Sequence, residues 1–453
     1  LSHKIKPLKL GVFFYFILMK KTFAFLLILT LSNSCSQVKK ELTNSLWEQE
    51  GYDRILKIGD SDYIYYNKDN YSCSELAQGD FNGRFKIIQH KENLLILNPG
   101  GIVDYRFKRI TEMPNICNGE SKEKDNSYVL NFNSFWETFD NNYAFFKERN
   151  INWQNVYDEY LPKVKAINSD TSFGILLKEI VNEFNDSHIR LELPETSESK
   201  TFNSSYSKGD ILNNITTKYL TKSHQYNDGL IRWGLTTNSD IGYIGITDMN
   251  GFSNSKEPNQ PLEEFENEIK GVEFIMSKVL EDLNNTNSII IDLRFNGGGY
   301  ETVSLKLLSY FINEEKHILS VKSKTKDGFT PIQKYNIKPS QISNKTIYIL
   351  TSPFSASATE IFVLGSLTYN NFKRMGSKTS GIFSEILWKQ LPNGWEYSLS
   401  NEVYMDTNNK SYEGDGINVD LDTGYPIKRD EFYNSFFNSN KFSDKLIEDL
   451  IKK

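Results

Sequence analysis

The stretch from Trp47 to Arg109 consists of short apolar bursts separated by Gly, Asp and Asn. Bursts such as YDRILKIG, FKIIQH and NLLILN have the length of strands. Strand-length bursts with turn residues between them are typical of antiparallel sheets. We therefore expect a small antiparallel β domain over residues 46–118, and this segment contains no catalytic constellation.

A longer periodicity follows between Asn126 and Asn185. Segments such as FNSFWETFDNNYAFF and SFGILLKEIVNEF repeat apolar residues at intervals of three and four, which is the period of an amphipathic helix. The pattern predicts a helical segment over residues 126–195. Its first part carries an aromatic stripe, which we interpret as core packing rather than a ligand site: Phe132, Phe135, Phe139, Tyr143 and Phe146.

Residues 196–235 are rich in Ser, Thr, Asn and Lys, and this composition predicts an irregular connection or insertion. Over residues 236–428, strand-like runs such as IGYIGI and SIIIDLRF alternate with helix-length patterns such as VEFIMSKVLEDL. Such alternation predicts an α/β layered domain with helices on a largely parallel sheet. The charged residues 429–453 are expected to form a C-terminal helix.

The first 35 residues differ from the rest of the chain. From Met19, two lysines precede an apolar run, and small polar residues then lead to Cys35, which is the layout of a secretory signal. The apolar run is too short to span a membrane, which takes about 20 residues. We expect residues 1–35 to be a signal segment, with 1–18 an upstream extension, followed by a polar tether over 36–45.

Cys35 resembles the lipid-attachment cysteine of bacterial lipoproteins, although Ser32 stands where the usual pattern has Leu. The alternative is simple cleavage of the signal, with Cys35 incidental. Lipidation predicts an exported protein that a lipid on Cys35 anchors to a membrane, in the bacterial periplasm or at the outer membrane or cell surface.

Composition limits the choice of partners. The chain has 453 residues, of which 38% are hydrophobic and 24% charged, as in a soluble globular protein of two or three domains. Its formal charge of -6 is small and dispersed, so we expect no nucleic-acid partner. No residue spacing resembles a metal site, and we expect no cofactor. In an oxidising compartment Cys73 and Cys117 form a disulfide or remain two buried thiols, and the sequence leaves both open.

Three features at the ends of predicted strands are candidates for chemistry. The first is SIIIDLRFNGGGY, residues 288–300, in which a buried strand runs into Gly297, Gly298 and Gly299 before a helix. Such a turn exposes backbone N–H groups that bind an anion or a developing oxyanion. A phosphate loop or a plain tight turn would have the same pattern, but the lysine of a nucleotide-binding loop is missing.

The second feature is TIYILTSPFSASATEIF, residues 346–362, which is again a strand, a turn of small residues and a helix. A serine at such a turn projects into a cleft, as a nucleophile elbow requires. The alternative is a helix N-cap formed by Ser355 or Ser357, with Glu360 three residues after Ser357.

The third feature is NDSHIRL, residues 185–191, with His188 at the head of a strand after Asp186 and Ser187. The chain has only five histidines, so a histidine base comes from a short list. A lone histidine is usually structural, and His188 gains weight only from the other two features.

In this order, DSH, DLRFNGGG and FSASATE resemble the tail-specific (C-terminal-processing) protease family over roughly residues 45–425. The resemblance implies a crotonase-like (ClpP/crotonase) β/α core and the activity of a serine peptidase. It also implies that Ser357, the second serine of the SASA run, is the nucleophile. The oxyanion hole would then be formed by the N–H of Ala358 and a glycine of the turn, for which we name Gly297 and Gly298.

The family pattern also bears on the base. Many relatives pair the serine with a lysine about 25 residues downstream, but Ile382 occupies that place here, and Lys378 would serve only if the loop were shifted. The tricorn-like branch instead uses residues that match Ser187 and His188, together with a late glutamate that matches Glu413. This branch implies that His188 is the base, that Ser187 orients it, and that Glu413 acts through another hydroxyl or binds the substrate amine.

Relatives often carry a PDZ module before the core, but the 45 or so residues between Leu193 and Ile241 are too few for one. We expect a peptide or an unfolded protein as substrate, and nothing in the sequence fixes the oligomeric state. Two rivals remain: a non-catalytic protein that binds a peptide or a small apolar ligand on the same scaffold, and an esterase or lactamase.

Overall fold

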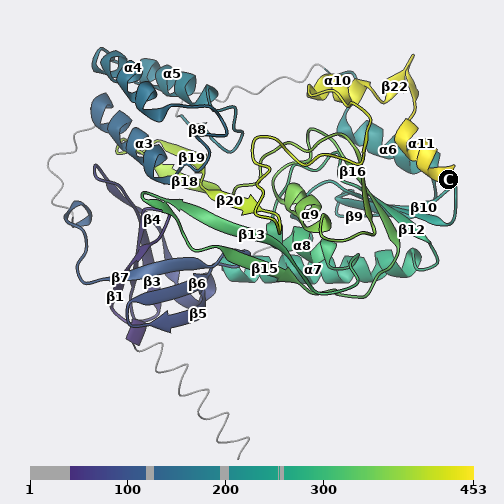
Figure 1. Cartoon of the computed structure of the whole chain (residues 1–453), viewed down its shortest axis with the longest axis horizontal. Coiled ribbons are helices and arrows are strands. Elements are labelled where there is room, and N and C mark those ends of the chain that lie inside the picture. The colour runs from purple at the N-terminus through teal and green to yellow at the C-terminus, as the bar shows by residue number, and fades with distance from the viewer. Residues whose placement is uncertain (1–40, 119–126, 194–203, 254, 256–259, 453) are drawn as a thin grey trace, which may run out of the picture.

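The computed structural model describes residues 41–118, 127–193, 204–253, 255 and 260–452. Figure 1 shows an N-terminal β domain, a group of helices above it and a larger α/β part beside both. The predicted signal segment and Cys35 lie outside the described residues. In the described ranges, no helix is both long enough and apolar enough to cross a membrane.

The N-terminal β domain is one antiparallel sheet of seven strands in the order β4-β3-β2-β1-β7-β6-β5. Side chains that alternate along the strands fill its core, among them Trp47, Leu56 and Phe107. Its elements are β1 (Ser45–Gln49), β2 (Arg54–Ile58), β3 (Asp62–Lys68), β4 (Cys73–Asp80), α2 (Phe81–Arg84), β5 (Lys86–Lys91), β6 (Leu94–Asn98), β7 (Tyr105–Ile110) and the 3-10 turn η1 (Asn115–Cys117).

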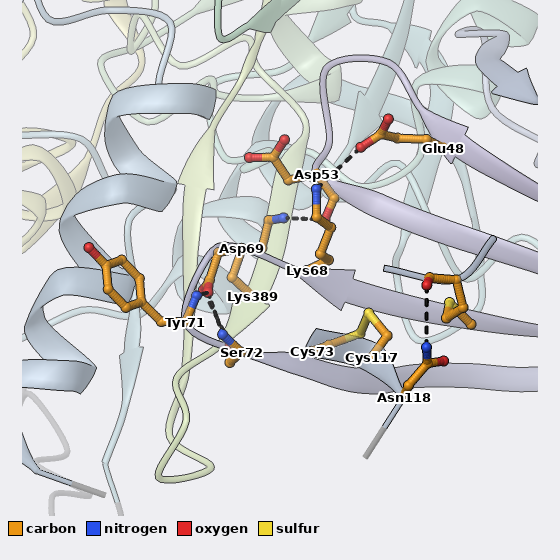
Figure 2. The surroundings of a disulfide bond; sticks show 11 residues. Glu48, Asp53, Lys68, Asp69, Tyr71, Ser72, Cys73, Cys117, Asn118 and Lys389 are labelled. Carbon is orange, nitrogen blue, oxygen red and sulfur yellow. Dashed lines mark hydrogen bonds and ion pairs between the residues drawn. A yellow bond between two sulfur atoms is a disulfide. The ribbon is translucent and has the colours of Figure 1, made fainter. Parts of the chain in front are cut away.

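A disulfide bond joins Cys73, at the start of β4, to Cys117 in η1, and it ties the end of the domain back to its edge strand. Figure 2 shows this bond next to Lys389, which reaches over from the neighbouring helical part. The Lys389 ammonium donates to the carbonyl oxygens of Tyr52 (2.6 Å) and Asp53 (3.2 Å). Burial lowers the pKa of Lys389 to about 7.

Replacing both cysteines by serine is expected to destabilise the β domain by about 4 kcal/mol, because the bond closes a loop of 44 residues in the unfolded chain. Thermal unfolding of the double variant measures this loss. Wild-type protein in a reducing buffer should match the variant, and a wild-type transition that does not respond to reductant would contradict the bond.

The helical part has three helices that pack on a small three-stranded sheet. Each helix begins at a polar N-cap, Ser127, Asn152 or Ser169, whose side chain accepts a backbone N–H. The aromatic stripe lies in the core between the helices and the sheet, as interpreted from the sequence. The elements are α3 (Tyr128–Asn142), α4 (Trp153–Lys165), α5 (Asp170–Asn182), β8 (Leu191–Glu192), β18 (Ile386–Gln390) and β19 (Glu396–Ser400).

The large α/β part is built on a seven-stranded sheet in the order β21-β17-β16-β12-β11-β10-β9, in which β10 alone runs opposite to the other strands and pairs antiparallel with β9 and β11. Successive side chains of β12 point to opposite faces of the sheet: Ile289 and Ile291 pack against one helix layer, and Ile290 packs against the other. The strands are β9 (Leu220–Tyr226), β10 (Ile231–Thr236), β11 (Ile241–Ile246), β12 (Ser288–Asp292), β16 (Thr346–Thr351), β17 (Phe372–Gly376) and β21 (Leu421–Asp422).

Helices cover both faces of this sheet, and a second small sheet extends beside it. The helices of the core are α6 (Lys208–Tyr219), α7 (Pro261–Asp282), α8 (Glu301–Leu308) and α9 (Ala358–Ser366). The small sheet consists of β13 (Lys316–Thr325), β14 (Gly328–Phe329), β15 (Gln333–Ile337) and β20 (Glu402–Met405).

Two expectations need correction. Residues 208–235 of the predicted connection 196–235 form α6, β9 and all but the last residue of β10 instead. A capping box of Ser207 and Asp210 begins α6. The helix buries one apolar face that ends at Tyr219, and its polar exposed face gives the segment the composition of a loop. The expected C-terminal helix is two short helices with a hairpin between them: α10 (Arg429–Asn434), β22 (Phe437–Asn438), β23 (Lys441–Phe442) and α11 (Lys445–Ile451).

Candidate active site

Ser357 lies at the carboxyl edge of the core sheet, where residues 352–357 lead from β16 into α9; we call this segment the nucleophile turn. Its backbone has φ 56° and ψ -128°, a conformation that non-glycine residues rarely adopt and that is typical of functional turns. Ser357 occupies the N-cap position, yet its side chain makes no capping hydrogen bond. The hydroxyl is therefore not used by the helix.

Ser355 has the opposite environment. It is fully buried, and its hydroxyl donates to the Leu293 carbonyl at 2.9 Å while accepting the Ser352 N–H at 3.0 Å. Ser355 thus joins the ends of β12 and β16, and its hydroxyl is engaged in that connection.

Residues 296–299, which we call the glycine turn, lie directly against Ser357. A Cβ atom on Gly298 would stand 2.6 Å from the Ser357 Cβ and 3.2 Å from the Ala358 nitrogen, so only glycine fits there. Asn296 fixes the turn: its Oδ1 accepts the Gly298 N–H at 2.9 Å and the Thr359 hydroxyl at 2.7 Å. The glycine turn of residues 288–300 and the serine turn of residues 346–362, which are distant in sequence, are therefore in contact.

This geometry bears on the predicted oxyanion donors. The Gly298 N–H already donates to Asn296, so it is engaged in this arrangement. Gly297 is exposed, and within the described residues neither its N–H nor that of Ala358 has an acceptor. Of the three donors named from the sequence, Ala358 and Gly297 are the two that are free.

A loop of residues 380–384, which we call the cover loop, packs on the nucleophile turn. The Ser357 N–H donates to the Ile382 carbonyl at 2.9 Å, and the Ser380 N–H donates to the Ser355 carbonyl at 3.0 Å. Glu360 in α9 receives the N–H groups of Gly381 and Ile382 at 2.8 and 2.7 Å. Ile382 thus lies beside Ser357, at the sequence position where the family pattern has its lysine.

Lys378 does not replace that lysine in this structure. Its ammonium forms an exposed ion pair with Asp415 at 2.5 Å. An ammonium held in such an ion pair has no lone pair with which to accept the proton of a serine.

Glu413 is buried beneath the cover loop. Its Oε2 accepts the N–H groups of Phe383 and Ser384 at 2.8 and 3.2 Å, and its Oε1 accepts from Arg149 at 3.3 Å. Burial and the nearby Asp186 raise the pKa of Glu413 to about 8, against the opposing effect of the Phe383 N–H. Glu413 thus connects Arg149 to the cover loop, and its two predicted roles, acting through another hydroxyl or binding the substrate amine, stay predictions.

Arg149 connects this loop to the histidine motif. While one of its nitrogens contacts Glu413, another donates to the Asn185 carbonyl at 2.8 Å, immediately before Asp186. The guanidinium is buried, with 8% of its side chain exposed. Arg149 is a site residue that the sequence did not reveal, because it stands in a helix-to-helix connection without a motif of its own.

His188 is buried next to Asp186. The backbone N–H of His188 donates to Asp186 Oδ1 at 2.9 Å, and the Tyr143 hydroxyl donates to Asp186 Oδ2 at 3.0 Å. The imidazole Nδ1 is buried without a hydrogen-bond partner. Ser187 is exposed and is not among these contacts, and the Asp186 carboxylate binds the backbone of His188 rather than its ring, so the orienting role of Ser187 stays a prediction.

The ionisation of His188 is shifted by its surroundings. Burial lowers its pKa to about 4, the Asp186 carboxylate opposes this shift, and Arg190 adds to it. The Ser384 backbone of the cover loop also acts on this pKa, which places the imidazole beside that loop. In the described residues no hydrogen bond joins His188 to Ser357, and the cover loop is what both residues have in common.

The lowered pKa of His188 predicts that activity is lost only at low pH. If neutral His188 is the base, kcat/KM should stay constant down to about pH 5 and be lost as the pH falls through about 4. Since the folded pKa lies below the unfolded one, stability should also fall between about pH 6.5 and 4. A pH profile of kcat/KM, taken where the protein remains folded, measures this loss of activity, and a midpoint at or above 6.5 would contradict it.

A cavity of about 230 Å³ opens beside the glycine turn. Gly299 of that turn and the following Tyr300 line it, and Tyr105 lines it from the β domain. Three carboxylates also line it, those of Glu301, Glu385 and Glu402. The β domain thus contributes a wall to this cavity, which reaches the glycine turn at Gly299 but is not lined by Ser357.

Comparison with known proteins agrees with this architecture. Residues 240–423 match the model described as Peptidase family S41, and residues 125–182 match the model described as Tricorn protease C1 domain. Proteins described as CtpA-like serine proteases also match: one of Staphylococcus saprophyticus is 26% identical over 180 residues, which are 40% of this chain and 33% of that protein. One of Staphylococcus aureus strain N315 is 29% identical over 138 residues, 30% of this chain and 27% of that protein.

Two solved structures share the fold. A protein of Parabacteroides merdae described as a peptidase has a TM-score of 0.53 and 22% identity over 66% of this chain and 90% of that one. Mature CPAF complexed with lactacystin has a TM-score of 0.50 and 12% identity over 72% and 97% of the two chains.

These matches agree with the resemblance to tail-specific proteases that the motifs carry: residues 240–423 match Peptidase family S41, and the curated relatives are CtpA-like serine proteases. The tricorn C1 match covers the three helices of the helical part and the connection between α3 and α4 that contains Arg149. The chain spans about a third of the length of the first curated relatives it matches.

Proposed function

We propose that this protein is a serine peptidase that hydrolyses peptide bonds with Ser357 as its nucleophile. The observation that carries the proposal is the contact of Gly298 and Ala358 with a serine whose backbone is strained and whose hydroxyl serves no helix cap. Strain at one serine, with free N–H donors around it, is the arrangement of a nucleophile elbow.

In the proposed reaction the Ser357 Oγ attacks the carbonyl carbon of the substrate, and His188 accepts the hydroxyl proton. The N–H groups of Ala358 and Gly297 stabilise the oxyanion, a contribution of about 10²–10³ in rate for each donor. His188 then gives the proton to the leaving amine, and water hydrolyses the acyl-enzyme with the same base. In this proposal the hydrogen bond between His188 and Ser357 forms only when the substrate is bound. Catalytic hydrogen bonds are often long or poorly aligned in structures without substrate.

The finer fold assignment is part of this proposal. The parallel order of β11, β12, β16 and β17, with both site turns at one edge, supports a crotonase-like core. Arg149, Asp186 and Glu413 support the tricorn-like branch, because they connect the histidine motif to the cover loop without a lysine.

The location of the protein is also proposed. The signal-like run before Cys35 supports export and lipid attachment, and a disulfide between Cys73 and Cys117 fits an oxidising compartment. Mass spectrometry of the membrane fraction tests this: a diacylglyceryl group on Cys35 is expected, and a free N-terminus beyond Cys35 would contradict lipidation.

Substrate class is tested with three ligands of matched sequence: a peptide, its ester and an uncleavable analogue. An unfolded protein and the peptide should yield new termini detectable by mass spectrometry. Cleavage of the ester alone would make the protein an esterase. Binding of the intact peptide without any cleavage would favour the second candidate function, that of a non-catalytic peptide-binding protein. The observation behind this candidate is that no hydrogen bond joins His188 to Ser357 in the described residues.

A further inference from the structure

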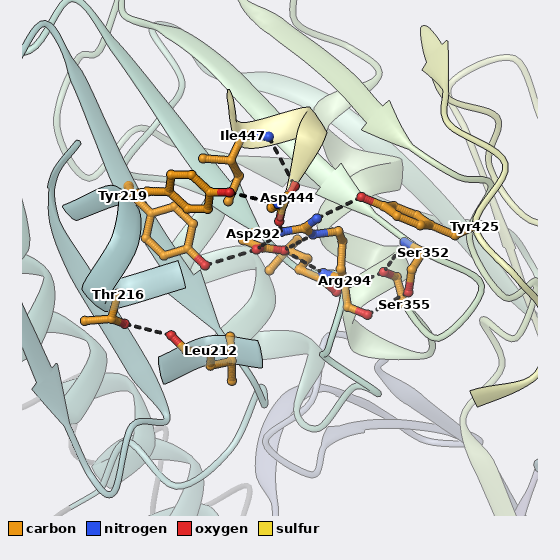
Figure 3. A network of polar contacts seen from close by, with 12 residues as sticks. Leu212, Thr216, Tyr219, Asp292, Arg294, Ser352, Ser355, Tyr425, Asp444 and Ile447 are labelled. Carbon is orange, nitrogen blue, oxygen red and sulfur yellow. Dashed lines mark hydrogen bonds and ion pairs between the residues drawn. The ribbon is translucent and has the colours of Figure 1, made fainter. Parts of the chain in front are cut away.

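Arg294 lies at the centre of a buried ionic cluster beneath the two site turns (Figure 3). Its side chain is fully buried and donates to both oxygens of Asp292, at 2.9 and 2.6 Å. A second carboxylate, that of Asp444, accepts from Nη2 at 2.7 Å, and the Tyr425 hydroxyl accepts from Nη1 at 2.8 Å. The guanidinium is thus fixed from three directions.

The backbone around Arg294 contacts the nucleophile turn and leads into the glycine turn. The Arg294 carbonyl accepts the Ser352 hydroxyl at 2.6 Å, and the Leu293 carbonyl accepts the Ser355 hydroxyl at 2.9 Å. Two residues after Arg294, Asn296 begins the glycine turn that contacts Ser357. A displacement of the Arg294 backbone would therefore move the nucleophile turn and the glycine turn relative to each other.

Asp444 comes from the other end of the chain. It is the N-cap of α11, where its Oδ1 accepts the Ile447 N–H at 3.2 Å while its Oδ2 serves Arg294. The Asp444 N–H donates to the Tyr219 hydroxyl of α6 at 2.8 Å. This residue lies beyond residues 240–423, the part that matches the S41 model.

We propose that Asp444 is a positioning residue for the active site: by fixing Arg294 it keeps the glycine turn in register with Ser357. The inference rests on the proposed peptidase function and extends it to the C-terminal segment 429–452. That segment is then a working part of the active-site scaffold, since transition-state stabilisation depends on donors placed to within a fraction of an ångström.

The variant that tests this is Asp444→Asn. An amide has one oxygen, so it cannot accept from both Ile447 and Arg294, and its NH2 group would face one of these donors. The matched control is Glu448→Gln on the same helix, whose carboxylate accepts from Lys218 and Tyr219 at 2.9 and 2.6 Å and does not contact Arg294. Asp444→Ser is a second variant that keeps the cap but does not reach Arg294.

Both Asp444 variants are expected to lower kcat about tenfold or more, with KM changed less than twofold, because donor placement acts on the transition state. Glu448→Gln should leave kcat within twofold even where it lowers Tm. Equal kcat in the Asp444 variants and the wild type, or equal losses in all three variants, would overturn the inference.

Amide hydrogen exchange separates this inference from the proposed function, because it requires no activity. Residues 293–298 and 352–357 should exchange faster in Asp444→Ser than in Glu448→Gln. A change confined to α11 would refute the positioning role. An inactive wild type with the expected exchange pattern would instead remove the peptidase proposal and leave the structural coupling in place.

Discussion

Replacement of Ser357 by alanine is expected to reduce peptide hydrolysis by roughly a factor of 10⁵, because the nucleophile is lost while the oxyanion donors and the binding surface remain. The fold should be unaffected, since the Ser357 hydroxyl makes no helix cap and both residues bear the same backbone strain. Initial rates with a peptide substrate, together with Tm, measure the two effects.

Ser355→Ala is the matched control, two residues earlier in the same turn. It removes a buried hydroxyl that bonds to Leu293 and Ser352, so we expect a loss of about 1–3 kcal/mol in the free energy of unfolding. Its kcat should remain far above that of Ser357→Ala. The assignment of the nucleophile would be wrong if Ser355→Ala abolished activity and Ser357→Ala did not.

The second large effect is expected for His188→Ala, which should lower kcat by roughly 10³–10⁵ because His188 is the general base of the proposed reaction. Lys378→Ala should retain a rate close to the wild type, since that ammonium is exposed and paired with Asp415. Rates of both variants at pH 7 and pH 9 provide the comparison.

The higher pH separates the two candidate bases. A lysine base gains activity as it is deprotonated, whereas His188 is already neutral at pH 7. A near-normal rate in His188→Ala with a collapse in Lys378→Ala would reverse the assignment of the base.

Much of the fold follows from local pattern. The alternating bursts before Arg109 and the three-residue and four-residue spacing after Asn126 predict elements that the structure contains. The α6–β10 segment was missed because nearly half its residues face solvent, and its polar composition resembles a loop. The pairing of residues 386–400 with the helical part was also missed, because such contacts join segments that are distant in sequence.

The site could be predicted only as far as its motifs extend. Ser357, the glycine turn and His188 stand in recognisable strings, whereas Arg149 and Glu360 act through ion pairs and backbone donors contributed by distant segments. The distinction between Gly297 and Gly298 as donors also depends on a single contact, that of Asn296. These contacts depend on tertiary packing, which the spacing of residues along the chain does not predict.

The most direct test of the account is labelling with a fluorophosphonate, which reacts only with an activated serine. The labelled protein is digested, and mass spectrometry locates the modified residue. The account predicts a single adduct on Ser357, which should be absent from Ser357→Ala and strongly reduced in His188→Ala. A label on another serine, or a protein that cleaves peptides without being labelled, would contradict it.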